Sequence, residues 1–495
     1  MTQPCSEQSR RPERSEGESI KHGCGVMGVY GCPDAVDKVY YGLYALQHRG
    51  EESAGIASTN GKSIQWHKGM GLVNQVFTPE DLKRLRNHAA IGHVRYSTMG
   101  ISHALNAQPL VGECSLGQVA IAHNGQLAEA VSRKRLLEAQ GTVFQTTCDT
   151  EIILHLIARP EYHKDLSNLF KNLKGSFSLL ILTQKEMIAV RDPGGFRPLC
   201  LGKVEGGYVV ASESCALDQA GAEYIREVAP GEIIYINKDG MRAERFAPER
   251  PSYCIFELIY FSRPDSRFVG QNVHLFRKAL GIKLAEEQPA EADIVVPVPE
   301  GGNSAAMGYS QASGIPLDRG FIRNHYVGRT FILPRADSRS RKAEIKLNAI
   351  PEVVRGKRVV VVDDSIVRGT TSKSRFSLLR KAGAKEIHVR ISCPPHRYPC
   401  YYGIDFQIKE ELIAATRSLK EMPGFLDVDS LGYLSIEGML SCTPSPKDYC
   451  IACFAGKYPI PVGEEEKKTP SGSPPHADAT LEEREERVGE HTIVV

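Results

Sequence analysis

The stretch RVVVVDDSIVRGTTS, residues 358–372, decides the fold of the second half of this 495-residue chain. Its short, uninterrupted apolar run is typical of a parallel strand that is buried on both faces. The run ends in two adjacent carboxylates, Asp363 and Asp364, and a turn with glycine and hydroxyl side chains then opens a helix. Ligands of open α/β sheets bind at the carboxyl ends of the strands, and a helix N-terminus offers N–H groups to a phosphate. The stretch therefore predicts a phosphate-binding loop.

The two carboxylates limit which phosphorylated ligands could bind at this loop. They would repel a phosphate unless sugar hydroxyls, a divalent metal or a developing positive charge lay between them. The loop therefore predicts a phosphorylated sugar, with the hydroxyls of Thr370, Thr371 and Ser372 at the phosphate. The alternative interpretation is an acidic turn that only caps the helix, with Asp364 or Ser365 as N-cap.

The sequence around this loop has the alternation of a parallel α/β domain. Apolar strands are expected at 293–299 and 387–392, and a helix at 372–384. Residues 251–462 are therefore predicted to form an α/β domain. Residues 463–495 are polar and rich in proline and serine, and we expect them to be disordered.

Composition limits the classes of protein. Lysine plus arginine number 61 and aspartate plus glutamate 59, a net charge of +2 that gives no argument for nucleic acid or membrane partners. No run approaches the roughly 20 apolar residues of a membrane span. The 13 cysteines follow a leader without an export signal, so we expect reduced thiols and a cytoplasmic location. The length allows two large domains.

The first half, residues 24–250, predicts a different architecture. Helical patterns are clear only at 36–50 and 150–160, and the rest is dominated by short strands separated by glycine, proline and asparagine. This mixture predicts an α+β sandwich of packed sheets with helices outside. The expected strands are SIQWHKGMGLV, VAIAHNG, SFSLLILT, MIAVRD, GYVVASES and EIIYINKDG.

Cys24 stands where the charged leader, residues 1–23, gives way to a foldable pattern. If the leader were removed as a propeptide, the thiol would carry its own base, because a free α-amino group has a pKa of about 7.7 to 8.0. The alternative is a buried strand cysteine without a chemical role.

Three later segments, GHVRYSTMG, AHNGQL and TTCDTE, contain the groups that an amino-acid amide substrate needs. Arg95 can hold its carboxylate and Asp149 its amine, while the Asn124 side chain and the Gly125 N–H can stabilise an oxyanion. With LQHRGEESAGIA, this series resembles the class II, N-terminal-nucleophile glutamine amidotransferases, whose fold is an αββα sandwich. The resemblance implies that Cys24 attacks glutamine.

The loop at 358–372 resembles the signature of type I phosphoribosyltransferases, which bind 5-phosphoribosyl 1-pyrophosphate. Both halves together resemble the amidophosphoribosyltransferase family, which makes 5-phosphoribosylamine, pyrophosphate and glutamate at the start of purine synthesis. The resemblance implies Mg²⁺ at the carboxylate pair, a closing loop from Arg323 to Asn348, purine nucleotide inhibitors and a dimer or tetramer. The implied phosphoribosyl pyrophosphate ligands are Lys346, Asp363, Asp364, Ser365, Gly369, Thr370, Thr371 and Ser372.

Two positions depart from this family pattern. Gly301 stands where a serine or threonine of the magnesium site is expected, and Glu51 where glutamine is expected. We therefore expect Mg²⁺ to depend on substrate oxygens, water and Asp363 or Asp364. Neither departure removes the nucleophile or the phosphate loop.

Four cysteines form a further candidate site. Cys450 and Cys453 have C-x-x-C spacing, and Cys254 and Cys400 would complete four ligands for zinc or a [4Fe–4S] cluster, between which spacing cannot choose. The resemblance implies the cluster, because the branch of the family with a propeptide carries one at these positions. Second choices as ligands are Cys393 and Cys442.

Two competing functions remain. A glucosamine-6-phosphate synthase type of enzyme would share the first half, but the loop at 358–372 speaks against it. A catalytically silent regulator that binds phosphoribosyl pyrophosphate is the other, and Gly301 favours it.

Overall fold

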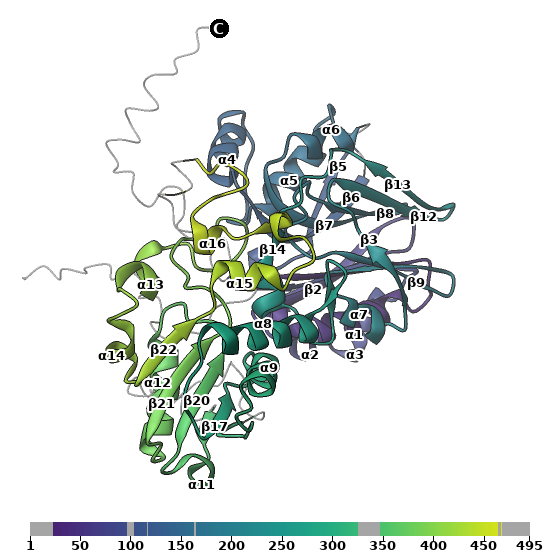
Figure 1. The fold of residues 1–495 in the computed structure, drawn as a ribbon. Coiled ribbons are helices and arrows are strands. Elements are labelled where there is room, and N and C mark those ends of the chain that lie inside the picture. Colours follow the sequence, from purple (N-terminus) through teal and green to yellow (C-terminus); the bar gives the residue numbers. More distant parts are fainter. Residues whose placement is uncertain are drawn as a thin grey trace, which may run out of the picture.

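The computed structural model describes residues 23–96, 103–115, 117–162, 165–324, 347–463 and 467. Figure 1 shows two parts, one of stacked strands in purple to teal and one with a smaller sheet in green. Residues 1–22 of the predicted leader, the predicted tail apart from residues 463 and 467, and most of the predicted closing loop lie outside the described residues.

Strand β1, which directly follows Cys24, lies at the centre of the first sheet. This sheet has seven strands in the order β11-β9-β10-β1-β4-β2-β3, and β1 is antiparallel to both of its neighbours, β10 and β4. The strands are β1 (Gly25–Tyr30), β2 (Ser53–Thr59), β3 (Ile64–Met70), β4 (Ala89–Arg95), β9 (Cys200–Val204), β10 (Gly207–Ala211) and β11 (Glu223–Glu227).

The second sheet carries the AHNG segment. It is antiparallel, with six strands in the order β13-β12-β8-β7-β6-β5. The strands are β5 (Leu110–Cys114), β6 (Gly117–Leu127), β7 (Gly175–Thr183), β8 (Glu186–Arg191), β12 (Glu232–Asn237) and β13 (Gly240–Arg245).

The two sheets stack through fully buried apolar side chains, among them Val26, Ile91, Ala120 and Leu180. Alternation of inward apolar residues makes this layer stable, because each sheet buries one face against the other. Helices cover the outer faces, so the predicted αββα sandwich is confirmed. They are α1 (Ala35–Ala45), α2 (Val73–Val76), α3 (Pro79–Leu85) and α7 (Ser214–Gln219) beside the first sheet, and α4 (Ala130–Ala139), α5 (Thr150–Ile157) and α6 (Leu166–Lys171) beside the second.

The second half is the predicted α/β domain. Its four parallel strands run in the order β17-β20-β21-β22, and every valine from Val359 to Val362 is fully buried. That burial explains the unbroken apolar run, since helices cover a parallel sheet. The elements are β17 (Ile294–Pro297), β20 (Arg358–Asp363), β21 (Glu386–Ile391), β22 (Ser430–Tyr433), α8 (Val273–Glu287), α9 (Asn303–Ser313), α12 (Thr370–Lys381) and α14 (Met422–Leu426).

Short elements complete the described chain. A parallel strand pair, β14 with β23, brings two distant segments together. These elements are the short helices η1 (Gln47–Arg49), η2 (Ala104–Asn106), η3 (Glu257–Phe261), α11 (Pro351–Val354), η5 (Lys409–Glu411), α13 (Ile413–Thr416), α15 (Ile436–Ser441), η6 (Pro446–Asp448) and α16 (Ala452–Ala455), and the strands β14 (Tyr253–Cys254), β15 (Arg267–Phe268), β16 (Gln271–Asn272), β18 (Phe321–Arg323), β19 (Leu347–Ala349) and β23 (Tyr449–Cys450).

Two sequence predictions differ from the structure in detail. The strand expected at 63–73 ends at Met70, because Gly71 turns the backbone with φ +121° and a helix begins at Val73. Strand β22 was not predicted. Its sequence, SLGY, is too short to give a periodic signal.

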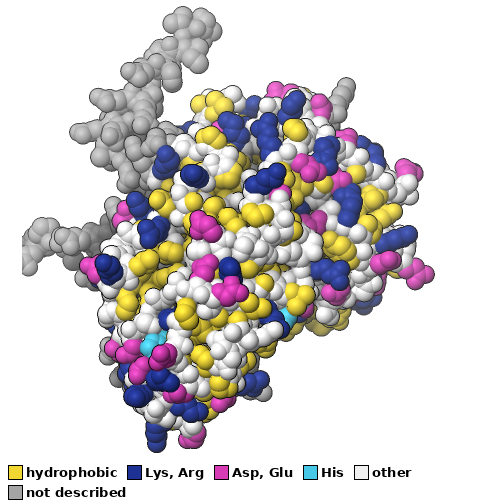
Figure 2. All heavy atoms as spheres, viewed as in Figure 1, with side chains coloured by type: hydrophobic (Ala, Val, Ile, Leu, Met, Phe, Trp, Pro, Cys, Tyr) yellow, Lys and Arg dark blue, Asp and Glu magenta, His cyan; other side chains and the backbone are white. Residues whose placement is uncertain are grey.

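The surface agrees with the balanced composition. On the face that Figure 2 shows, basic and acidic side chains are interspersed, and neither sign forms a continuous patch. Among the described residues, no helix has both the length and the apolar character that crossing a membrane requires.

Candidate active sites

Cys24 immediately precedes β1, and its thiol is buried at 7% exposure. Burial raises the pKa of the thiol to about 11, against smaller lowering effects of the Tyr96 carbonyl and Arg95. The Sγ atom lies 3.5 Å from Tyr96 O. The thiol is therefore almost entirely protonated near neutral pH, and an attack by this sulfur needs a base.

Arg95 ends β4 beside β1, with Gly25 opposite Val94 in the register. Its side chain is buried at 2% exposure, and its Nη1 donates to Glu52 Oε1 at 2.7 Å. Both groups act on the thiol of Cys24, Arg95 lowering and Glu52 raising its pKa. The Arg95 side chain is therefore not part of a surface ion pair, and it lies close enough to Cys24 to affect the pKa of its thiol.

Asn124 and Gly125 lie in β6, which faces β1 across the sandwich. The Asn124 Nδ2 atom is buried and has no hydrogen-bond partner within the described ranges. A Cβ built on Gly23 would lie 3.7 Å from Asn124 Oδ1, so this amide lies beside the Gly23–Cys24 junction. Gly125 has φ +150°, and a Cβ there would lie 2.0 Å from Ser176 O, so no other residue fits.

Asp149 precedes α5 and is 4% exposed. Burial opposes its ionisation, but His123 and the Leu127 N–H outweigh burial, and the pKa of the carboxyl is lowered. Leu127 N donates to Asp149 Oδ2 at 2.9 Å, and His123 Nδ1 lies 3.6 Å from Oδ1. The carboxylate is therefore ionised and able to bind an amine.

The sequence analysis missed the residues that support this carboxylate. His123 N donates to Gln108 Oε1 at 2.8 Å, and Gln108 Nε2 donates to Thr150 Oγ1 at 3.0 Å. His123 stands beside Asn124 in the AHNG segment, which was a usable signal. Gln108 had none, because it lies outside every quoted motif and only the fold brings it to β6.

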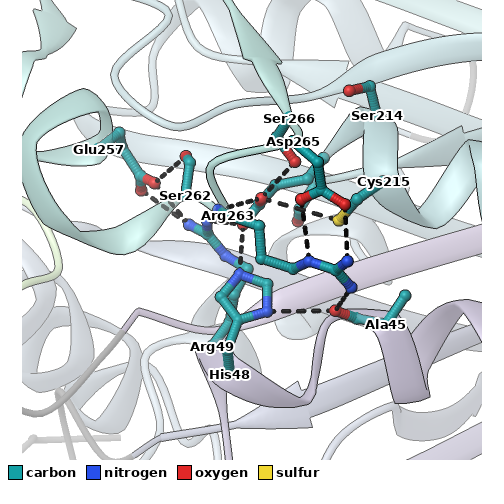
Figure 3. A network of polar contacts seen from close by, with 12 residues as sticks. Ala45, His48, Arg49, Ser214, Cys215, Glu257, Ser262, Arg263, Asp265 and Ser266 are labelled. Atoms are coloured by element: carbon teal, nitrogen blue, oxygen red, sulfur yellow. Dashed lines mark hydrogen bonds and ion pairs between the residues drawn. The ribbon is translucent and has the colours of Figure 1, made fainter. Parts of the chain in front are cut away.

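A buried ion network behind Cys24 was also missed. Arg49 Nε donates to Cys24 O at 2.9 Å, while its other nitrogens bind Glu213 and Glu257. Figure 3 shows Arg49 reaching Glu257, with His48, Ser262, Arg263 and Ser266 around the network. Glu257 belongs to η3 in the second half and also accepts from Arg197 at 2.9 Å. The Cys24 carbonyl is thus tied through Arg49 to the second half.

The phosphate loop has the predicted strand-turn-helix form. Asp363 ends β20 and α12 begins at Thr370, after Gly369 with φ +79°. Ser365 Oγ donates to Asp364 Oδ1 at 2.6 Å, so this serine supports the carboxylate rather than capping α12. The alternative interpretation, a helix cap by Asp364 or Ser365, does not hold, because Gly369 occupies the N-cap position.

The carboxylate pair is electrostatically strained without a ligand. Burial raises the pKa of both groups, and at Asp363 the neighbouring Asp364 raises it further. Arg375 Nη1 lies 3.2 Å from Asp363 Oδ2 and offsets part of the charge. Arg277, fully buried on α8, acts on Asp364, and burial lowers the pKa of Arg277 to about 10. A cation or sugar hydroxyls at this pair would relieve the repulsion.

The structure gives a reason for Gly301. A Cβ at this position would lie 1.6 Å from Asp364 Oδ2, so a serine or threonine does not fit this arrangement. The loop packs closely against Asp364, and this packing leaves no room for a side-chain oxygen at residue 301. Lys346, the predicted pyrophosphate ligand, lies outside the described residues.

The four predicted cysteine ligands lie together. Cys254 and Cys450 are directly opposite in the β14–β23 pair, and Cys453 lies in α16. Burial raises the pKa of each thiol, and at Cys453 the other three raise it further. Over the described ranges, no group of three or more His, Cys, Asp or Glu side chains is arranged to hold a metal ion.

The two second-choice cysteines, Cys393 and Cys442, lie in different surroundings. Cys393 is fully buried and also acts on Cys453, but its own strongest charged neighbours are Asp364 and Asp363. Cys442 caps α15, where its neighbours are Lys283, Glu286 and Glu287. The structure therefore brings Cys254, Cys400, Cys450 and Cys453 together and leaves Cys442 apart.

Comparisons with known proteins agree with the predicted class of each half. A glutamine amidotransferase domain family matches residues 93–219, and a phosphoribosyl transferase domain family matches residues 275–402. The fold and sites define a glutamine amidotransferase joined to a phosphoribosyltransferase.

Relatives specify the family. The chain is 48% identical to the amidophosphoribosyltransferase of Bacillus subtilis, over 90% of this chain and 96% of that protein. It is 46% identical to the one of Methanothermobacter thermautotrophicus, over 90% and 96%. The chain belongs to the amidophosphoribosyltransferase family, and the predicted function, the first step of purine biosynthesis, is confirmed.

Solved structures of similar proteins agree with this family assignment. The B. subtilis glutamine phosphoribosylpyrophosphate amidotransferase complexed with ADP and GMP matches with a TM-score of 0.85, covering 89% of this chain and 98% of that chain at 48% identity. A structure described as the allosteric regulatory enzyme of purine biosynthesis matches with a TM-score of 0.86, covering 93% and 100% at 47% identity.

Proposed function

We propose that Cys24 releases ammonia from glutamine and that the loop at 363–372 uses it to aminate phosphoribosyl pyrophosphate. One observation supports the glutaminase part of this proposal. Asn124 Nδ2 is a buried donor without a hydrogen-bond partner in the described part of the chain. A buried unsatisfied donor costs about 1–3 kcal/mol, and an oxyanion hole is a physical reason to keep one.

The proposed glutaminase steps use groups of the first half. The α-amino nitrogen of Cys24 takes the thiol proton, and the sulfur attacks the glutamine amide carbon. Asn124 and Gly125 stabilise the oxyanion, while Arg95 and Asp149 hold the substrate's carboxylate and amine. The proton returns to the leaving nitrogen, ammonia departs, and water hydrolyses the thioester to glutamate.

The proposed transfer uses the second half. Ammonia attacks the anomeric carbon as pyrophosphate leaves, and the positive charge that develops on the sugar lies beside Asp363 and Asp364. The segment from Ser365 to Ser372, with Gly369 at the start of α12, would hold the 5-phosphate through N–H groups and hydroxyls. Lys346 remains the proposed pyrophosphate ligand.

Two inorganic groups are part of the proposal. Hard carboxylate oxygens at Asp363 and Asp364 fit Mg²⁺, which would neutralise pyrophosphate charge. The thiols of Cys254, Cys400 and Cys450 all act on the thiol of Cys453, and four thiolates of this kind would suit a [4Fe–4S] cluster. This cluster would be structural, because neither half-reaction transfers electrons.

The remaining proposals concern the chain as a whole. We propose a propeptide of residues 1–23 cut before Cys24, a glutaminase domain at 24–250, a phosphoribosyltransferase domain at 251–462 and a disordered tail at 463–495. The relative from B. subtilis was solved with ADP and GMP, which supports inhibition by purine nucleotides. A homo-oligomer in the cytoplasm completes the proposal.

The test of function compares purified wild-type protein with Cys24→Ser. Wild type should begin at Cys24 by N-terminal sequencing and release glutamate and pyrophosphate in equal amounts. Cys24→Ser should lose glutamine-dependent turnover and keep the ammonia-dependent reaction. A protein that binds phosphoribosyl pyrophosphate without releasing pyrophosphate would instead be the silent regulator, and an active protein that starts at Met1 would contradict the Cys24 mechanism.

The cluster is tested by metal analysis. Wild type should contain about four irons per chain and absorb visible light. Cys450→Ser should lose the iron, and Cys442→Ser, which alters a thiol outside the group of four, should keep it. Stoichiometric zinc without iron would contradict the proposal.

A further inference from the structure

The loop from Cys400 to Gln407 belongs to the second half but lies against the oxyanion residues of the first. Gly403 has φ +96°, and a Cβ built on it would lie 3.0 Å from the Gly125 carbonyl carbon and 3.2 Å from its oxygen. Gln407 Nε2 also donates to Gln126 Oε1 at 2.7 Å. The backbone of this loop therefore touches the segment that the proposed function uses for the oxyanion.

Arg197 holds the same loop from the first half. It is fully buried at 0% exposure, and its Nε and Nη2 both donate to Tyr402 O, at 3.1 and 2.7 Å. Its Nη1 donates to Glu257 Oε1 at 2.9 Å, and Glu257 also binds Arg49, which holds Cys24 O. One buried network thus fixes both the residue before Gly403 and the backbone of the nucleophile.

The space at Gly403 is closed on two sides. The same Cβ built on Gly403, which would contact the Gly125 backbone, would also lie 3.3 Å from Arg197 Nη2. Backbone atoms and a guanidinium that is held by three hydrogen bonds cannot move aside cheaply, unlike the end of a flexible side chain. Any side chain at residue 403 must therefore shift Gly125, Arg197 or the loop itself.

We propose that Gly403 is a positioning residue for the glutamine half-reaction, and that Arg197 is its partner. The loop sets the backbone of Asn124 and Gly125 at the distance that an oxyanion requires, and Arg197 sets the loop. This inference rests on the proposed function, because it takes Asn124 and Gly125 as the oxyanion hole. Catalysis is sensitive to such placement, since a 1 Å displacement can cost about 10²-fold in rate.

The inference also links the group of four cysteines to the position of the loop from Cys400 to Gln407. Cys400 begins the loop, and its Sγ accepts from Tyr402 N–H at 3.4 Å. Arg197 Nη1 lies 3.8 Å from Cys254 Sγ. A group bound by these thiols would therefore anchor the same loop that Arg197 holds.

The test compares Gly403→Ala with Gly356→Ala. Gly356 has a similar backbone, φ +73°, but a Cβ there has nothing within 4 Å, so this control carries the backbone strain without the contact. Gly403→Ala should lower the glutamine-dependent kcat about 10- to 100-fold and change the KM for glutamine less than about 2-fold. Ammonia-dependent turnover and iron content should match the control.

A second variant keeps the inference falsifiable if Gly403→Ala folds poorly. Arg197→Lys keeps a cation near Glu257 but loses the fork onto Tyr402 O, and it should show the same selective loss of kcat with glutamine. An unchanged glutamine kcat in both variants, or equal losses of the glutamine- and ammonia-dependent rates, would overturn the inference. Failure of the proposed function would look different, because wild type itself would then release no pyrophosphate.

Discussion

At the scale of single residues, the thiol of Cys24 shows why its own α-amino group matters. Burial raises its pKa to about 11, so the protein around it works against the reactive thiolate. The neighbouring cation Arg95 lowers the pKa, but it is also bound to Glu52, which raises it. A neutral thiol with a base of its own on the same residue resolves this conflict.

The pH dependence of glutamine turnover tests this account. The α-amino group accepts a proton only when it is neutral, so the rate should rise with pH through about 7.7–8.0 and then level off. Thiolate formation at a pKa of about 11 without a base would instead give a rate that still climbs near tenfold per unit at pH 9–10. The measurement is glutamate release against pH for the processed enzyme.

Cys148→Ser is the matched control for this profile, because Cys148 is a second buried thiol that acts on Cys24. The variant should keep the same pH profile and a rate within about tenfold of wild type, since its sulfur takes no part in the proposed steps. A complete loss of glutamine turnover in Cys148→Ser, with turnover retained in Cys24→Ser, would show that Cys148 and not Cys24 is the nucleophile.

At the scale of elements, the turn between β20 and α12 depends on one glycine. Gly369 has φ +79° at the N-cap position, and a Cβ there would lie 2.6 Å from Ile413 Cδ1. The helix that follows begins with Thr370, Thr371 and Ser372, so the position of Gly369 determines where their N–H groups and hydroxyls point.

Gly369→Ala should therefore weaken phosphoribosyl pyrophosphate binding. Left-handed strain costs about 1–3 kcal/mol, which corresponds to roughly a 5- to 150-fold rise in the KM for this substrate. Pyrophosphate release with ammonia as nitrogen donor measures it without the glutaminase half.

The control for this variant is Gly314→Ala at the end of α9. Gly314 has φ +72° but nothing within 4 Å of a built Cβ. It should leave the KM within about twofold, because the strain there is far from the phosphate turn. Equal shifts in both variants would show that strain alone, and not the phosphate turn, sets the KM.

At the scale of the whole molecule, a buried ion network joins the halves. Arg49, Arg197, Glu213 and Glu257 are all at most 1% exposed, and their two positive and two negative charges balance. Burial opposes ionisation of Glu257, but Arg49 and Arg197 outweigh it and hold the pKa of its carboxyl below the ordinary value. Removing one member leaves an unpaired buried charge.

Glu257→Gln should therefore lower the free energy of unfolding by about 3–5 kcal/mol, the cost of breaking a buried pair. Asp265→Asn is the matched control, because its pair with Arg263 has side chains 52% and 40% exposed. It should cost at most about 1 kcal/mol. Denaturant midpoints of the two variants measure the difference, and similar midpoints would contradict a stabilising role of the network.

Much of this protein follows from local sequence. The α+β sandwich, the α/β domain and the strand-turn-helix at 358–372 were predicted because strand periodicity, glycine turns and apolar runs are local signals. The αββα order of layers came from the resemblance to the glutamine amidotransferases. The roles of Cys24, Arg95, Asp149, Asn124 and the carboxylate pair came from motifs and from that resemblance, and they stay predictions. Short β22 carried too weak a pattern to find.

Other features depend on contacts between distant parts of the chain. Glu257 is 208 residues from Arg49, and Tyr402 is 205 residues from Arg197, so no sequence pattern connects them. The packing of Gly301 against Asp364 and of Gly403 against Gly125 likewise exists only after folding. Sequence by itself determined the folds of the halves and predicted the residue types of each site, because those depend on local patterns. Only the tertiary structure decided how the halves meet, since burial and close approach are set by packing.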